Sequence, residues 1–348
     1  MAIPSAFTTV LLAALASLIL GAVWLLTFRA AGKVRFELFA LDFGMGAFVA
    51  AMATGLTLGT FGTDIAFYDN LNIMRKSSVL FLFGFGMLTC LGLWLFLGAA
   101  SVAGTATVFV TGASMAVLVS SLGTHMVRPM TSGLYVAISA VLLTAAVALG
   151  ARAQIERLRQ RDLDLLQKAA AAGVKGKVAR SSPAKGLILA VASGIALGLM
   201  PPSVEWVQLR DEIAFGAYCI TVLVGVAFLI GGPFIALFFL NLPVQGEALP
   251  FGAWLKLQPK QHLMGVLGGM LWFAALVGLY IACANPRAEM ARNLAFAVSR
   301  GSLVLGAAIG IFVQGDYSIS SSARMAGLIG LLAAMAALVV LAAAPAIA

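Results

Sequence analysis

Long apolar runs without a charged residue recur along this chain of 348 residues, and they restrict it to one class of fold. A helix needs about 20 apolar residues to cross the hydrocarbon core of a bilayer. The chain is 62% hydrophobic and only 10% charged, whereas soluble domains average about 45–50% apolar and about 25% charged residues. The sequence therefore predicts an all-α, polytopic membrane protein.

Ten runs reach the required length and predict ten transmembrane helices. The first begins without a preceding basic residue and is too long for a typical signal peptide, so it is expected to stay as the first helix. A tight antiparallel turn is predicted from Gly98 to Val102. The predicted helices are Ala6–Thr27, Glu37–Gly59, Ser78–Leu97, Ala103–Leu122, Ser132–Ala151, Gly186–Glu205, Phe215–Leu240, His262–Ala284, Leu294–Gln314 and Ala323–Leu341.

One long hydrophilic stretch, Arg152 to Lys185, separates two sets of five predicted helices and holds nine of the 22 basic residues. Its first part, to Ala172, has apolar residues at helical spacing and predicts a helical stalk or an interfacial helix. Its second part, Gly173 to Pro183, contains helix breakers and predicts a flexible tether. The predicted organisation is a first repeat at 1–151, a basic linker at 152–185 and a second repeat at 186–348.

The distribution of basic residues predicts the orientation. The connections on the side of the linker carry 15 of the 22 lysine and arginine residues, and the rest of the chain carries 7. The positive-inside rule then places the linker in the cytoplasm and both termini outside, in a cytoplasmic (inner) membrane. Such clustering is typical of topology signals and of attraction to anionic lipid headgroups, so no nucleic-acid partner is expected.

Five helices per half require that two similar halves run through the membrane in opposite directions. Ala16–Gly21 in the first predicted helix resembles Ala192–Gly198 in the sixth. Val110–Ser114 in the fourth resembles Val298–Ser302 in the ninth. These matches predict two inverted five-helix repeats, a common architecture of secondary transporters.

Several motifs resemble those of a known family. The junction after the first helix, GKVRFELFALDFGMG at Gly32–Gly46, and the run HLMGVLGGMLW at His262–Trp272 are the most specific. Others are Ala103-Gly104 with Phe109 and Gly112, Lys185-Gly186-Leu-Ile-Leu, and Leu294-Ala-Phe-Ala with Gly301. Together they cover nearly the whole chain and resemble the bacterial ureide-permease-like and glucose/ribose-porter-like branch of the drug/metabolite transporter superfamily.

The resemblance implies a ten-helix transporter with a cytoplasmic loop between helices five and six. It also implies a sugar or a small nitrogen-rich metabolite as substrate, moved in many relatives together with a cation. Three positions depart from the family pattern. Ala22–Leu26 keeps only the tryptophan of a Gly-Ser-Trp-x-Asn-like element, Val110 replaces a proline, and Arg300 stands at a glutamine-like position.

Aromatic and hydroxyl side chains within the predicted helices are candidates for lining a central cavity. Aromatic faces stack on sugar or purine-like rings, and hydroxyls hydrogen-bond to them. Two alternatives stay open: hydroxyls in membrane helices also bond a backbone carbonyl or allow close helix contact, and tryptophans also form interfacial belts. The candidate substrate-binding residues are Trp24, Thr111, Ser114, Trp272, Ser299 and Ser302.

Arg300 is the seventh substrate-binding candidate. It lies about six residues into the predicted ninth helix, where a charge costs about 2.5–3.5 kcal/mol on insertion scales. One interpretation is an anchor for a carboxylate or another anion in the cavity. The other is that the long side chain snorkels to the outer headgroups.

Three carboxylates are candidates for ion coupling or gating. Glu205 follows Pro201–Ser203 at the outer end of the sixth predicted helix, where it pairs with Arg300 or lies exposed at the interface. Glu37 and Asp42 lie near the cytoplasmic end of the second, beside three basic residues. They form an inner gate or cation site, or an interfacial charge cluster that fixes the end of the helix.

Other functional classes have weaker support. No Gly-x-x-x-x-Gly-Lys-Ser/Thr run for binding nucleotide is present, and neither the cysteines nor the histidines have metal-ligand spacing, so no cofactor or metal is expected. A membrane enzyme would need a catalytic set, and only Glu205, Asp211 and Glu212 gather on one side.

The sequence therefore predicts a secondary transporter that moves a small polar metabolite by alternating access. The expected partners are that substrate, membrane lipids and a coupling proton or sodium ion, and a homodimer stays open. The alternatives are an exporter of amphipathic compounds, which an apolar lining would suit, and a membrane scaffold subunit that transports nothing.

Overall fold

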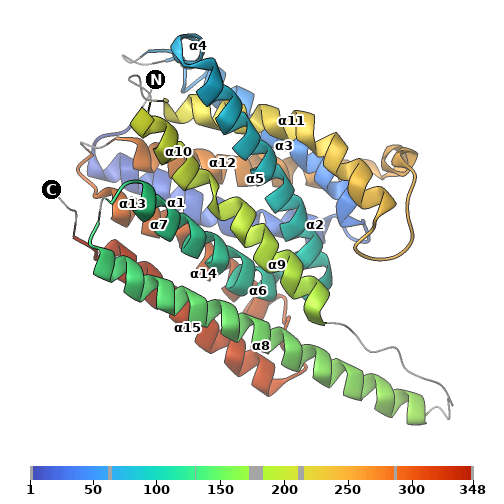
Figure 1. Ribbon diagram of the computed structural model, residues 1–348. Coiled ribbons are helices and arrows are strands. Elements are labelled where there is room, and N and C mark those ends of the chain that lie inside the picture. Colours follow the sequence, from blue (N-terminus) through green and yellow to red (C-terminus); the bar gives the residue numbers. More distant parts are fainter. Residues whose placement is uncertain are drawn as a thin grey trace.

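The computed structural model describes residues 3–61, 65–129, 131–171, 183–210, 215–285 and 288–345. Within these ranges, ten helical spans are long and apolar enough to cross a membrane, and the chain is an all-α, multi-pass membrane protein (Figure 1). Large apolar side chains cover the outside of the bundle, among them Leu80 and Phe234, which are 70% and 69% exposed. The predicted fold class is confirmed.

The first half of the chain forms spans 1 to 5. Span 1 is broken into two helices and span 4 into three segments. A short helix, α4 (Phe67–Ile73), lies between spans 2 and 3. In chain order the spans are α1 (Phe7–Val23) with α2 (Leu25–Ala30), α3 (Phe36–Leu56), α5 (Lys76–Ala103), α6 (Thr105–Thr107) with the π-helix η1 (Val108–Ala113) and α7 (Ser114–Val127), and α8 (Gly133–Ala171).

The second half forms spans 6 to 10 with similar interruptions. Spans 6 and 9 are the broken ones, and a 3₁₀ helix, η2 (Phe251–Lys256), lies between spans 7 and 8. In chain order the spans are α9 (Pro183–Gly198) with α10 (Met200–Arg210), α11 (Ala217–Asn241), α12 (Pro259–Ala284), α13 (Arg292–Arg300) with α14 (Ser302–Ala308) and the π-helix η3 (Ile309–Val313), and α15 (Ser321–Ala342).

Contacts between the halves come in matched pairs. Span 1 packs on spans 8 and 9, and span 6 packs in the same way on spans 3 and 4. Span 2 packs on span 8, and its equivalent, span 7, packs on span 3. Spans 2 and 7 also contact each other, and so do spans 5 and 10. Exchanging each span with its equivalent five places later reproduces this pattern, as expected of two inverted five-helix repeats.

The two ends of the bundle take their names from the chain segments that lie there. The linker end is where α8 ends and α9 begins, and the terminal end is where α1 begins and α15 ends (Figure 1). α8 continues unbroken through Arg152 to Ala171 and projects beyond the other helices (Figure 1). The predicted helical stalk is therefore confirmed, and a separate interfacial helix is wrong. Of the predicted tether, residues 173–182 lie outside the described residues.

The turn between spans 3 and 4 lies later than predicted. α5 continues through Gly98 to Ala103, and the chain reverses at Gly104, whose φ is +87°. Glycine takes this conformation without the steric strain of a Cβ atom. The predicted connection from Gly98 to Val102 is wrong, because Gly98 is an interior helix residue packed against Phe36.

Helix breaks occur at equivalent places in the two halves. Span 1 is interrupted at Trp24 and span 6 at Leu199. The break in span 6 directly precedes Met200-Pro201-Pro202, and a proline has no N–H to donate to the preceding turn. The π-helices do not follow this symmetry, since η1 begins span 4 and η3 ends span 9, so both lie toward the linker end.

Glycines bring spans 2 and 8 into backbone contact. A Cβ atom on Gly46 of α3 would overlap the backbone of Val266, and one on Gly269 of α12 would overlap the carbonyl oxygen of Phe43. Helices in lipid associate through such close packing, because the hydrophobic effect does not distinguish a lipid neighbour from a protein one. This pair therefore depends on the absence of side chains at the two glycines.

We expect Gly269→Ala to destabilise the protein by about 1–3 kcal/mol, because the added methyl group forces α3 and α12 apart. Thermal unfolding of the purified protein in detergent measures this. The matched control is Gly84→Ala, because Gly84 is exposed within α5 and a methyl group there meets nothing within 4 Å. An equal change in both variants would contradict the role of the α3–α12 contact.

Candidate functional site

A cavity of about 110 Å³ lies inside the bundle, lined by spans 1, 3, 4, 6, 8 and 9. Spans 1, 3 and 4 are the equivalents of 6, 8 and 9, so each half contributes the same three elements. Within the described ranges, spans 2 and 7 contribute no lining residue. Those two spans are occupied by their contacts with each other and with spans 8 and 3.

Aromatic rings form one wall of the cavity and extend behind it. Trp24 of span 1 contacts Phe43 and Phe96, with ring centroids 5.2 and 5.7 Å apart. Trp272 of span 8 lies 6.0 Å from the ring of Phe43, and Phe109 of span 4 lies 5.4 Å from that of Phe96. These four contacts join spans 1, 2, 3, 4 and 8, so the rings both bound the cavity and hold its walls together.

Five of the seven predicted substrate-binding residues line the cavity: Trp24, Trp272, Ser299, Arg300 and Ser302. Trp24 is 2% exposed, so its assignment to an interfacial belt is wrong. Ser299 donates its hydroxyl hydrogen to the carbonyl oxygen of Ala295 at 2.9 Å. The alternative of a backbone-satisfied hydroxyl therefore holds for Ser299, although its side chain lines the cavity.

Thr111 and Ser114 are fully buried but do not line the cavity, so their predicted placement is wrong. In span 4 the cavity face consists of Phe109, Ala113, Ala116 and Val117, spaced by about one helical turn. Thr111 points the other way and lies against the position of Gly150 in α8. It belongs to the contact between spans 4 and 5.

Among the residues that the structure describes, Arg300 is the only charged one in the cavity lining. It ends α13, immediately before the short break at Gly301. Its guanidinium carbon lies 5.3 Å from the centre of the Phe296 ring, and its Nε atom is buried without a hydrogen-bond partner. Of the two interpretations, the structure places this side chain at the cavity rather than at the headgroups.

A cluster of three charged residues, the terminal-end cluster, lies beyond the cavity toward the terminal end. Glu205 of span 6, with its side chain 2% exposed, pairs with Arg292 at the start of span 9. Arg128, which follows span 4, lies 3.8 Å away from the same carboxylate. The expected exposure of Glu205 is therefore wrong, and so is the expected pairing with Arg300. Asp211 and Glu212 lie outside the described residues.

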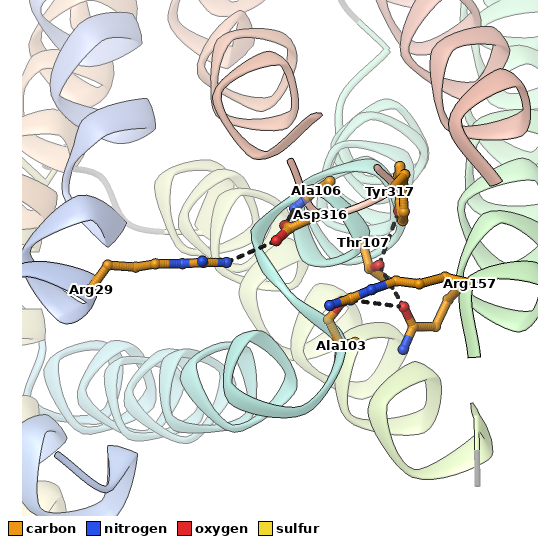
Figure 2. A network of polar contacts seen from close by, with 8 residues as sticks. Arg29, Ala103, Ala106, Thr107, Arg157, Asp316 and Tyr317 are labelled. Atoms are coloured by element: carbon orange, nitrogen blue, oxygen red, sulfur yellow. Dashed lines mark hydrogen bonds and ion pairs between the residues drawn. The ribbon is translucent and has the colours of Figure 1, made fainter. Parts of the chain in front are cut away.

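At the opposite end a second cluster, the linker-end cluster, joins spans 1, 4 and 9 (Figure 2). Asp316, which follows span 9, has a side chain that is only 3% exposed. One carboxylate oxygen accepts a hydrogen bond from Arg29 of span 1 at 2.9 Å, and the other accepts one from the backbone N–H of Ala106 in span 4 at 2.8 Å. The cluster therefore ties the linker ends of three cavity-lining spans together.

A second layer of polar contacts lies beside Asp316 (Figure 2). Thr107 donates to the side-chain oxygen of Gln154 at 3.1 Å, so the Tyr317 hydroxyl, 3.0 Å from Thr107, must be the donor to Thr107. Arg157 of α8 donates to the carbonyl oxygen of Ala103 at 2.5 Å. Burial raises the pKa of Tyr317 well above its usual range, which keeps the phenol protonated and able to donate.

The remaining gating candidates, Glu37 and Asp42, lie outside the cavity lining near the linker ends of spans 2 and 8. Arg35 pairs with Glu37 at 2.8 Å at the end of the helix, but the Glu37 side chain is only 1% exposed, so this charge pair is buried rather than interfacial. Asp42 instead accepts hydrogen bonds from Trp254 at 3.0 Å and contacts the His262 ring nitrogen at 2.9 Å. Its side chain is 3% exposed, so Asp42 is buried rather than interfacial.

Sequence reasoning missed several residues of these sites. Ser17, Thr89 and Tyr280 line the cavity, and an isolated hydroxyl in an apolar run was the signal that could have found Thr89. Asp316 was missed although it is an acidic residue beside Gly315 at the end of a span. Its partners come from residues 287 and 210 positions away, a separation that one sequence without relatives does not reveal.

Comparisons with known proteins support the fold and leave the function open. No family model and no curated protein matches the chain. A solved structure described only as the crystal structure of a protein is similar, with a TM-score of 0.52 and 18% sequence identity. The similarity covers 96% of this chain and 98% of that one. At this identity the likeness concerns the fold alone.

We expect Tyr317→Phe to destabilise the protein by about 1 kcal/mol, because it removes the hydrogen bond to Thr107. The raised pKa of Tyr317 adds a pH dependence. A folded-state pKa above the unfolded value of about 10 contributes stability that is complete below pH 10 and is lost as the pH rises through the folded-state pKa. Above pH 10, the Tyr317→Phe variant should therefore lose less stability than the wild type.

Chemical unfolding monitored between about pH 8 and pH 11, a range that spans the usual tyrosine pKa, measures both effects. Tyr68→Phe is the matched control, since Tyr68 is 50% exposed. A wild-type stability that falls no faster at alkaline pH than that of Tyr317→Phe would contradict the assignment.

Proposed function

We propose that the protein is a secondary transporter that moves a small metabolite by alternating access through the central cavity. The observation that carries the proposal is the position of the cavity between the linker-end and terminal-end clusters. The cavity is built from equivalent spans of two inverted halves, and the two clusters use equivalent spans as well. In an inverted repeat, equivalent helices of the two halves end at opposite faces of the membrane, so each face can open by an equivalent movement.

The two clusters are related by the symmetry of the halves, with the signs of charge exchanged. At the linker end, Arg29 of span 1 binds Asp316 at the end of span 9. At the terminal end, Glu205 of span 6 binds Arg292 at the start of span 9 and lies near Arg128 at the end of span 4. Both clusters are formed in this structure, so charged groups are paired at both ends of the cavity.

Each cluster suits a gate because its basic side chains are partly open to solvent. Arg29, Arg128 and Arg292 are 45%, 46% and 33% exposed. The acids themselves are only 2–3% exposed, so a cluster can open only if water or another partner replaces the lost contacts of its carboxylate. A solute with different affinity for the two open states would then shift the equilibrium between them.

The resemblance to the ureide-permease-like and glucose/ribose-porter-like branch supports a sugar, ureide or nucleobase-like substrate. The rings of Trp24 and Trp272 offer faces for stacking, and Ser302 offers a hydroxyl. Asp42 with His262 is our candidate for coupling to a proton, since both groups can exchange one. We place the linker end in the cytoplasm and the termini outside an inner membrane, from the excess of basic residues at the linker end.

An exporter of amphipathic compounds is the second candidate. The observation that favours it is the mostly apolar lining, which includes Leu93, Phe96, Leu276 and Leu279. The volume of about 110 Å³ limits such a compound to a small one in this state. Transport of a panel containing glucose, allantoin, uracil and a small amine into proteoliposomes separates the two candidates.

Accessibility of the cavity tests the gates directly. A cysteine replaces Ser302 in a Cys283→Ser background, and a membrane-impermeant maleimide is added from one side of oriented vesicles. We expect slow labelling from both sides in the starting protein. Asp316→Asn should raise the labelling rate several-fold from the linker side alone, and Glu205→Gln should raise it from the terminal side alone, because each weakens one cluster.

The matched control is Asp164→Asn, which removes an acid on the stalk that bonds Gln160 at 3.2 Å and lies away from both clusters. It should leave both rates unchanged. Labelling that stays slow in all variants, together with no uptake of any panel compound, would favour the membrane scaffold. Labelling that rises from the wrong side would overturn the assignment of the gates.

A further inference from the structure

We infer, on the basis of the transport function proposed above, that the transported solute carries one anionic group, and that Arg300 binds it. The chemistry fits a small monocarboxylate with a compact apolar body. The inference rests on the charge of the cavity, which is separate from the gating clusters, and on the cavity's size and lining.

The charge of Arg300 is not neutralised by the part of the chain that the structure describes. No carboxylate there lies within 4.0 Å of its guanidinium group, and Glu205 is held by Arg292 and lies near Arg128. Arginine stays protonated in proteins and has five N–H donors. An unpaired charge at the centre of a span costs about 2.5–3.5 kcal/mol, so the empty cavity favours the entry of an anion.

Among the described residues, the guanidinium group contacts an aromatic ring, and Tyr280 and Cys283 lie near enough to interact with its charge. The Phe296 ring lies 5.3 Å away, and this contact occupies one face of the planar group. The edge that carries the N–H donors stays available, and Nε is buried without a partner. A carboxylate can accept two parallel hydrogen bonds from that edge, which a neutral amide or a hydroxyl cannot match.

The rest of the lining determines what else the solute can carry. Arg300 is the single charged residue among the described residues of the lining, so a dianion such as a phosphate monoester would keep an uncompensated charge. Hydroxyl groups from Ser302, Thr89 and Tyr280 can each bond one further polar atom. The remaining surface is mostly leucine and aromatic side chains, and the volume is about 110 Å³.

A structural role for Arg300 makes different predictions. If its function were to hold Phe296, or to join Glu205 in another state, the charge of an added solute would be irrelevant. Pairs of ligands with equal shape and different charge therefore distinguish an anion-binding role of Arg300 from a structural role. Propionate with propionamide, isobutyrate with isobutyramide, and benzoate with benzamide are such pairs.

The experiment measures thermal unfolding of the purified full chain in detergent with each compound, since a ligand that binds the folded state raises the melting temperature with its concentration. We expect the carboxylates to raise it and the amides not to. Arg300→Gln should weaken carboxylate binding at least tenfold, and Arg300→Lys by several-fold, because lysine keeps the charge and loses the planar fork. Sodium chloride at equal ionic strength controls for salt.

The matched control is Arg324→Gln. Arg324 also lies over an aromatic ring, that of Phe312 at 6.0 Å, but it is exposed at the start of α15 and outside the cavity. This variant should bind carboxylates like the wild type. Because the comparison of carboxylate with amide is made in the wild type, a failure of Arg300→Gln to fold does not remove the test.

Equal stabilisation by both members of each pair would overturn the inference, and so would carboxylate binding that is unchanged in Arg300→Gln. No effect of any carboxylate would overturn it as well. In each of these cases uptake of a neutral panel compound, together with one-sided labelling of the cavity, would leave the transport function standing. Absence of both uptake and labelling would remove the transport function itself.

Discussion

A charge within a lipid bilayer is costly unless it is paired, and this cost determines where most charged groups of the protein lie. Buried acids at both ends of the bundle have basic partners from distant parts of the chain: Glu205 with Arg292, Asp316 with Arg29, and Asp42 with His262. Pairing at the ends leaves the middle of the bundle mostly to apolar and aromatic side chains, with Arg300 as the charged exception among the described residues. The cavity can therefore form in the middle, where no ion pair has to be broken to make room for a solute.

The two halves are similar in their contacts and different in detail, and the differences concentrate at the linker end. Both π-helices lie toward that end, where a Cβ atom on Gly310 of η3 would overlap the backbone of Ala106. The second polar layer, which includes Arg157 and Tyr317, is described only for that end. π-Helical turns are frequent at functional sites, because their wider turn re-aims neighbouring side chains. The linker end is therefore closed by backbone contact as well as by charge.

The number of spans and their approximate positions follow from the sequence, because the length and apolarity of a spanning helix depend on local composition alone. The continuous stalk through Arg152 was predictable for the same reason. The face that each helix turns toward the cavity did not follow from the sequence. Thr111 and Ser114 lie on span 4 but do not line the cavity, and Glu205 pairs with Arg292 instead of Arg300. Both outcomes depend on which spans become neighbours in the folded bundle.

Arg300 shows why the sequence alone left its role undecided. A long basic side chain about one third of the way into a span can reach the headgroups, and nothing local excludes that outcome. The arrangement of α13 between spans 1, 8 and 10 excludes it here, because the side chain turns toward the cavity and its Nε is buried. In the transport cycle that we propose, a neutral solute would leave this charge unpaired in every state. An anion would compensate it whenever the cavity is occupied, so the charge that is costly in the empty protein would become the source of selectivity.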